Sequence, residues 1–166
     1  MKRRHVLSAF AGLLSSTFLP VRAADSGPAA VLKKTKAEWK ALLPLPSYRV
    51  LFEEDTEAPF THPLNNEKRA GTFVCLACSL PLFDSTTKYD SGTGWPSFYR
   101  ALPKSVGTKT DTLLFVPRTE YHCSRCGGHQ GHIFEDGPKP TGLRYCNNGL
   151  ALGFIPKGEK LPALRT

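Results

Sequence analysis

Two Cys-x-x-Cys pairs constrain this chain more than any other feature of its sequence. Two residues separate Cys75 from Cys78 and Cys123 from Cys126, and 44 residues lie between the pairs. Four thiolates arranged tetrahedrally are preferred ligands of Zn²⁺, and a two-residue spacer lets both sulfurs of one pair face a single ion. The spacing exceeds that of a minimal zinc ribbon, so an ion held by both pairs would join two distant turns of a larger domain. We therefore expect one structural Zn²⁺ per chain, because four protein ligands leave no open position for a substrate.

Two other uses of the four cysteines remain open from the sequence. An oxidising compartment favours disulfides, but a bridge within a Cys-x-x-Cys turn is strained and more typical of redox sites. Iron, bound as in rubredoxin, accepts the same four thiolates. The pattern favours zinc over both of these alternatives.

A fifth cysteine, Cys146, has no partner in this arrangement. It lies in the string RYCNN, where an extended strand would place Arg144 and Asn148 on its own face. A neighbouring cation lowers a thiol pKa below its free value of about 8.5 and makes the sulfur a better nucleophile. His129 and His132 stand 17 and 14 residues earlier and are candidate general acids or donors to an oxyanion. The alternative is that Cys146 is a small core residue and the two histidines are further metal ligands.

Residues 1–23 have the composition of an export signal. A basic start at residues 2–4 precedes a mostly apolar run at residues 6–19, and Ala23 is a small residue suited to cleavage. The run is shorter than the about 20 residues that a transmembrane helix needs. The arginine pair in the basic start resembles a twin-arginine signal, with a general secretory signal as the alternative and a retained anchor as the least favoured reading. We expect an exported protein, located in a bacterial periplasm.

The remaining 143 residues are enough for one domain with its own core. We expect a flexible linker at residues 24–34, one folded domain at residues 35–160 and a tail at residues 161–166. Without the signal, 18 Lys and Arg oppose 14 Asp and Glu, and the basic residues are spread along the chain. This charge pattern does not indicate nucleic acid, and we expect no membrane contact after cleavage and a monomer in solution.

The sequence of the N-terminal part of the domain predicts little regular secondary structure. Thr35 and Glu38 form a capping box, and a proline follows a few residues later, so we predict one short helix at residues 36–43. Prolines interrupt residues 47–69, where we expect irregular wrapping with one short strand or helical turn at residues 50–52.

Short β-rich segments separated by turn residues fill the rest of the domain. The predicted strands lie at residues 72–75, 82–83, 97–99, 113–116, 119–123, 132–135, 142–145 and 151–155. Regularly spaced short strands favour antiparallel sheets over a doubly wound parallel sheet.

Three strings give the chain a family resemblance. GTFVCLAC at residues 71–78, SGTGWPSF at residues 91–98 and the run at residues 123–148 resemble methionine sulfoxide reductases of the B type. These enzymes reduce the R epimer of methionine sulfoxide in proteins and peptides, and the resemblance extends from about residue 35 to about residue 156. It implies a mainly β fold of two antiparallel sheets, short N-terminal helices and a four-cysteine zinc site.

The resemblance also implies a catalytic role for each polar residue around Cys146. The Cys146 thiolate attacks the sulfoxide sulfur, methionine leaves, and the cysteine becomes a sulfenic acid. His129 and His132 bind and protonate the departing oxygen, and Asn148 helps to hold a water there. Arg144 stabilises the thiolate by its charge.

Three further positions bear on substrate binding and recycling. Trp95 matches the indole that receives the ε-methyl group of the substrate, although without the resemblance its position favours a core aromatic. Thr93 stands where many members of this family carry a resolving cysteine, so we expect recycling by an outside thiol, thioredoxin-like or other. Gln130, between the two histidines, occupies a position that is often leucine.

Two functions of other classes remain as alternatives. A zinc-ribbon-like interaction module would keep the metal site and lack catalysis. An iron-bearing electron-transfer protein would use the same four thiolates and be coloured.

Overall fold

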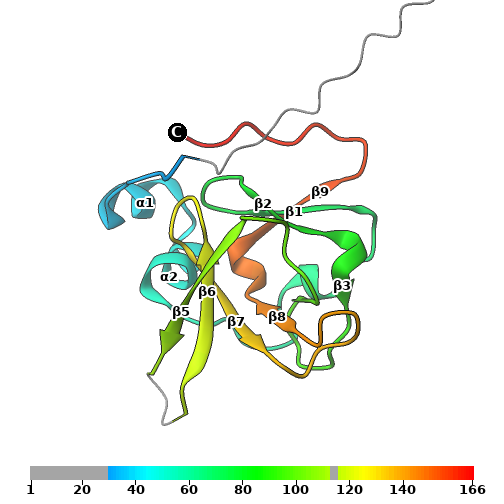
Figure 1. Cartoon of the computed structure of the whole chain (residues 1–166). Helices are drawn as coiled ribbons and strands as arrows, with labels where there is room; N and C mark the ends of the chain where they lie inside the picture. Colours follow the sequence, from blue (N-terminus) through cyan, green and yellow to red (C-terminus); the bar gives the residue numbers. More distant parts are fainter. Residues whose placement is uncertain (1–29, 113–115) are drawn as a thin grey trace, which may run out of the picture.

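The computed structural model describes residues 30–112 and 116–166. Within these ranges, two short helices precede nine strands that form one sheet of three strands and one of six (Figure 1). All strand pairs are antiparallel, which confirms the predicted mainly β class. The predicted signal at residues 1–23 lies outside the described residues, as do most of the predicted linker and most of the predicted strand 113–116.

Helix α1 (Lys36–Leu42) confirms the predicted first helix and its capping box. The Thr35 hydroxyl accepts from the Glu38 backbone N–H at 3.2 Å, and the Glu38 carboxylate accepts from the Thr35 backbone N–H at 2.7 Å. These two bonds satisfy donors that the first turn of a helix otherwise leaves unpaired.

Helix α2 (Leu45–Glu53) replaces the start of the stretch predicted as irregular wrapping. Pro44 is its N-cap and Pro46 lies in its first turn, where a missing backbone N–H costs nothing. Pro44 therefore follows the end of α1, as predicted, and also begins α2, which includes residues 50–52, where a short strand or a helical turn was expected. In the described part of the chain, no helix has both the length and the apolarity to cross a membrane.

The smaller sheet has the order β2-β1-β9. Its strands are β2 (Pro81–Asp84), β1 (Gly71–Cys75) and β9 (Leu152–Pro156). Three 3-10 turns, η1 (Pro63–Asn66), η2 (Ser85–Thr87) and η3 (Gly149–Ala151), connect the elements around it.

The larger sheet has the order β3-β4-β8-β7-β6-β5. Its strands are β3 (Lys88–Tyr89), β4 (Ser97–Phe98), β8 (Arg144–Asn147), β7 (His129–Phe134), β6 (Arg118–Cys123) and β5 (Val106–Asp111). Strand β8 lies between β4 and β7, so Cys146 stands opposite Ser97 on one side and His132 on the other.

Four of the strands differ from the prediction. Strand β7 starts at His129, three residues before its predicted start, and β8 is shifted by two residues because Gly142 adopts the left-handed conformation of a turn. Strands β3 and β5 were not predicted, since β3 has only two residues and the sequence of β5, VGTKTD, is polar, as an exposed edge strand allows.

An aromatic core joins the two sheets. The Phe98 ring of β4 stacks on Phe83 of β2 at 4.1 Å between centroids and meets the Phe73 ring of β1 at 4.9 Å. Trp39 of α1 belongs to the same buried cluster and stacks on Phe52 of α2 at 5.0 Å. Burying such rings is the main source of stability in a core of this kind, so the packing fixes the sheets against each other.

Candidate functional site

The four cysteines of the two Cys-x-x-Cys pairs meet in one cluster. The sulfurs of Cys75 and Cys126 are 3.6 Å apart, those of Cys78 and Cys123 are 3.5 Å apart, and all four lie within 4.8 Å of one another. In a regular tetrahedron of Zn–S bonds of about 2.3 Å, the sulfurs would be about 3.8 Å apart. All four are free thiols, and these separations are far longer than the about 2.05 Å of a disulfide. The cluster therefore fits a structural zinc ion, as the spacing predicted.

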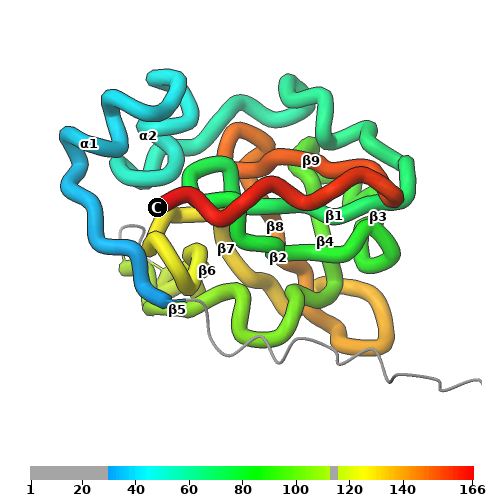
Figure 2. Tube along the Cα trace, turned by 90° about the horizontal axis from the view of Figure 1, so that it is seen from above, coloured from blue at the N-terminus to red at the C-terminus, as the bar shows by residue number. Residues whose placement is uncertain are grey.

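The cluster joins the two sheets and both ends of the described chain. Cys75 ends β1 of the small sheet, and Cys123 ends β6 of the large sheet. The Leu32 backbone N–H donates to the Arg125 carbonyl at 2.7 Å, and the Arg165 N–H donates to the Cys78 carbonyl at 3.1 Å. The first and last described segments therefore pack against the same pair of turns (Figure 2).

Cys146 lines a cavity of about 200 Å³ at the surface of the large sheet. Trp95, His132 and Asn148 line the same cavity, so the structure brings together four of the predicted site residues. Cys146 is half-buried in β8, its partner across the ladder is His132, and Asn148 follows the end of the strand.

A β-bulge places both predicted histidines near this cavity. Residues three apart in a regular strand point to opposite faces of the sheet. Here three residues of β7, from His129 to Gly131, lie opposite only two residues of β6, Tyr121 and His122. Gln130 is therefore the extra residue of a β-bulge. His129 and His132 consequently share a face, with their ring centroids 5.5 Å apart.

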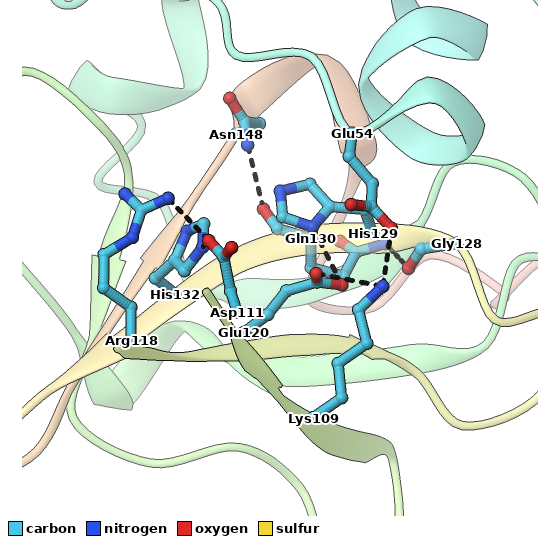
Figure 3. Close-up of polar contacts among 10 residues, drawn as sticks. All are labelled: Glu54, Lys109, Asp111, Arg118, Glu120, Gly128, His129, Gln130, His132 and Asn148. Atoms are coloured by element: carbon cyan, nitrogen blue, oxygen red, sulfur yellow. Dashed lines mark hydrogen bonds and ion pairs between the residues drawn. The ribbon is translucent and has the colours of Figure 1, made fainter. Parts of the chain in front are cut away.

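Each histidine also meets a carboxylate from another strand of the large sheet (Figure 3). Nε2 of His132 lies 2.8 Å from Asp111, which hydrogen-bonds it. Nδ1 of His129 lies 3.1 Å from Glu120, although that contact is not directed as a hydrogen bond. Burial lowers the pKa of His132, while the bond to Asp111 opposes this shift. At neutral pH the free His132 ring is therefore mainly neutral.

A cation balances each of these two carboxylates. Arg118 donates to Asp111 at 2.6 Å across the β5–β6 pair, and Lys109 lies 3.1 Å from Glu120. None of these four residues was predicted as a site residue, because they carry no motif of their own. The local signals are the alternation of Arg118 and Glu120 in β6 and that of Lys109 and Asp111 in β5, since residues two apart in a strand share a face.

Arg144 shares the face of Cys146, as predicted, but its net effect on the thiol is smaller than predicted. Its guanidinium binds both oxygens of Asp136 at 2.8 Å and covers the Phe134 ring at 4.2 Å. Burial raises the pKa of the Cys146 thiol, and this outweighs the lowering by the Arg144 charge and by hydrogen bonds from Thr93 and Arg144. At neutral pH Cys146 is therefore mainly a thiol, and Thr93 lies beside it.

Glu57 positions two of the site residues and was not singled out from the sequence. Its backbone carbonyl accepts from the Trp95 indole N–H at 3.1 Å, and its backbone N–H donates to the Asn148 side chain at 3.2 Å. Its buried carboxylate accepts from the backbone N–H groups of Gly149 and Leu150 at 2.6 and 2.8 Å. Only the tertiary structure shows this role, since more than 90 residues separate Glu57 from its carboxylate partners.

Comparisons with known proteins agree with this geometry. The model of the SelR domain matches residues 43–156. The chain is 52% identical over 127 residues to the peptide methionine sulfoxide reductase MsrB of Pseudomonas putida (strain W619), covering 76% of this chain and 96% of the relative. The MsrB of Thiobacillus denitrificans is 52% identical over 75% of this chain and 95% of its own length. That of Methanosarcina barkeri is 49% identical over 77% of this chain and 91% of its own length.

Proposed function

Because this chain belongs to the SelR family of MsrB-type peptide methionine sulfoxide reductases, we propose that it reduces the R epimer of methionine sulfoxide in proteins or peptides to methionine. The observation that carries the proposal is the meeting of Cys146 and His132 across one strand pair, at the wall of a cavity that also contains Trp95. A nucleophile, a proton donor and an apolar surface are what the reduction of a thioether sulfoxide requires.

The proposed step transfers one oxygen and two electrons. The Cys146 sulfur attacks the sulfoxide sulfur and forms an S–S bond, while the S–O bond of the substrate breaks and the protonated oxygen leaves as water. A water then attacks the Cys146 sulfur, which breaks the S–S bond, releases methionine and leaves a sulfenic acid on Cys146. The neutral His132 ring accepts the thiol proton of Cys146 and, together with His129, passes it to the departing oxygen, directly or through water. Since burial raises the pKa of Cys146 and lowers that of His132, both start mainly neutral at pH 7.

Two residues of the cavity wall orient the substrate in this proposal. The Trp95 ring packs against the ε-methyl group, and Asn148 holds a water beside the sulfoxide oxygen. Both are fixed through Glu57, whose backbone groups bind the indole and the amide. A rigid wall holds the sulfoxide sulfur at attacking distance from Cys146.

We propose that the four-cysteine cluster holds one Zn²⁺ with a structural role. Its ligands come from both sheets, so the ion would cross-link the fold and contribute folding free energy. When bound, the ion would hold the four thiolates together.

We further propose that an outside thiol reduces the Cys146 sulfenic acid. Among the described residues, the other four cysteines belong to the metal cluster, and Thr93 lies beside Cys146 where a resolving cysteine would stand. A thioredoxin-like protein or a small thiol would attack the sulfenic sulfur and then resolve the mixed disulfide.

A stereospecific assay tests the proposed activity. Purified protein is incubated with the R or the S epimer of N-acetylmethionine sulfoxide and dithiothreitol, and the methionine product is quantified. We expect turnover of the R epimer, and Cys146→Ser should abolish it while fold and zinc content stay unchanged. Retained activity in Cys146→Ser, or no turnover of either epimer by the wild type, would reject the proposal, and the second result would favour a zinc-binding interaction module.

A further inference from the structure

The side chain of Gln130 lies fully buried between the four-cysteine cluster and the active site. A buried amide is costly unless its donor and acceptor groups have partners. Gln130 is also the extra residue of the bulge that brings His129 and His132 together, and the proposed reaction gives its side chain no role.

The amide nitrogen of Gln130 faces the metal cluster. Nε2 donates to the Cys75 sulfur at 3.6 Å and to the Gly128 carbonyl at 3.5 Å. A thiolate that binds a metal keeps lone pairs directed away from the ion, and an N–H donor stabilises the charge on them. Such partners of ligating residues orient the ligands and tune the metal site.

The other groups of Gln130 face the catalytic strand. Its side-chain oxygen accepts from Asn147, the neighbour of Cys146, at 3.4 Å, and the Asn147 oxygen accepts from the Tyr121 hydroxyl at 2.7 Å. Its backbone carbonyl accepts from the Asn148 backbone N–H at 2.8 Å and from the Asn148 side chain at 3.2 Å (Figure 3). One residue therefore touches a metal-cluster thiol and two residues that flank the cavity.

We propose that Gln130 is a positioning residue that couples the zinc centre to the active site, by donating an N–H···S bond to the zinc-bound Cys75 thiolate while its backbone holds Asn148. The proposal rests on zinc occupying the cluster, as proposed above. It predicts that the Gln130 side chain sets both the electron density on one zinc ligand and the retention of the metal.

The test substitutes the amide without changing the volume of the core. Gln130→Met has nearly the length of glutamine and no donor, and Gln130→Leu is a second apolar variant with a different shape. Tyr121→Phe is the control, because it removes a hydroxyl from the same buried series of hydrogen bonds, and this hydroxyl donates to Asn147 and not to a thiol. Metal analysis of the wild type comes first, so that an empty cluster is recognised as a failure of the zinc proposal itself.

Two readouts report on the bond apart from activity. In Co²⁺-substituted protein, loss of an N–H···S bond raises the energy of the thiolate lone pairs, so the sulfur-to-cobalt band should move to longer wavelength in both Gln130 variants. Zinc should also bind at least about 10-fold more weakly, measured by competition with a chelator. Tyr121→Phe should match the wild type in both measurements.

The proposal is wrong if a folded Gln130 variant has the same cobalt spectrum and the same zinc affinity as the wild type. If neither variant folds, ¹¹³Cd-substituted wild type provides the test, because a bond from Gln130 to Cys75 should give scalar coupling between ¹¹³Cd and the side-chain amide protons. A well-resolved spectrum without that coupling overturns the proposal.

Discussion

At the scale of single residues, the pKa of Cys146 depends on two opposing effects, the burial of its thiol and the positive charge of Arg144. Burial raises the pKa of this thiol, and the positive charge of Arg144 lowers it. The net pKa is raised, so the thiolate fraction increases with pH through the neutral and mildly alkaline range. Arg144 itself is fixed by two hydrogen bonds to Asp136 and by the Phe134 ring, so its charge cannot move away from the sulfur.

Arg144→Met should therefore raise the pKa of Cys146 further. Below the pKa of a thiol, each unit of upward shift lowers the thiolate fraction about tenfold. We expect the pH midpoint of Cys146 alkylation by iodoacetamide to move to higher pH, and kcat/KM at pH 7 to fall with it. Arg100→Met is the matched control, since it removes the same charge from an exposed position. Equal midpoints in the wild type and Arg144→Met would contradict a role of this charge.

At the scale of elements, two pieces of backbone build the site. The bulge in β7 turns His129 and His132 to one face, and Gly131 lets β7 approach β8, because a Cβ atom there would lie 1.9 Å from the Cys146 carbonyl oxygen. The two Cys-x-x-Cys turns are the other piece, and they tie strand β1 to strand β6 through the metal cluster.

Replacement of one cluster cysteine should disrupt the link between β1 and β6. We expect Cys75→Ser and Cys126→Ser to lose zinc and to unfold at a temperature many degrees lower, since metal binding is linked to folding free energy. Metal analysis and thermal denaturation measure both effects. Cys146→Ser is the matched control and should keep its zinc and its melting temperature. A cluster variant as stable and active as the wild type would rule out a structural metal.

At the scale of the whole molecule, the fold determines how the enzyme is reset after each turnover. With the R-sulfoxide and no reductant, we expect one methionine per chain and a sulfenic acid on Cys146 that dimedone traps. Thr93→Cys should then allow an intramolecular disulfide with Cys146, because the two side chains are within hydrogen-bond reach in the structure. Intact-mass analysis measures both states. A disulfide between Cys146 and a cluster cysteine in the unmodified protein would show instead that a zinc ligand acts as redox partner.

Export is a second property of the whole chain, and it remains a proposal. The twin-arginine route carries folded proteins, so the cluster would take up zinc in the reducing cytoplasm before it meets an oxidising space. Replacing Arg3 and Arg4 together by lysine should leave the precursor in the cytoplasm, as cell fractionation and immunoblotting would show. Unchanged export of this variant would point to the general secretory route.

The sequence by itself determined the chemistry of this protein. The four clustered cysteines, the unpaired Cys146 and the first helix follow from residue types at short spacings, and such local patterns are present before the chain folds. The match of Trp95, Arg144 and Asn148 to one family adds the roles that spacing alone does not assign. These residues could be named because each belongs to a contiguous string.

The tertiary structure decided the arrangement around that chemistry. Asp111 and Glu120 reach the histidines from two other strands, and Glu57 reaches Asn148 across 91 residues of chain. The single extra residue Gln130 reverses which face His129 occupies. Strand register, bulges and long-range hydrogen bonds depend on which strands pair, and pairing is a property of the packed chain that a string of residues does not contain.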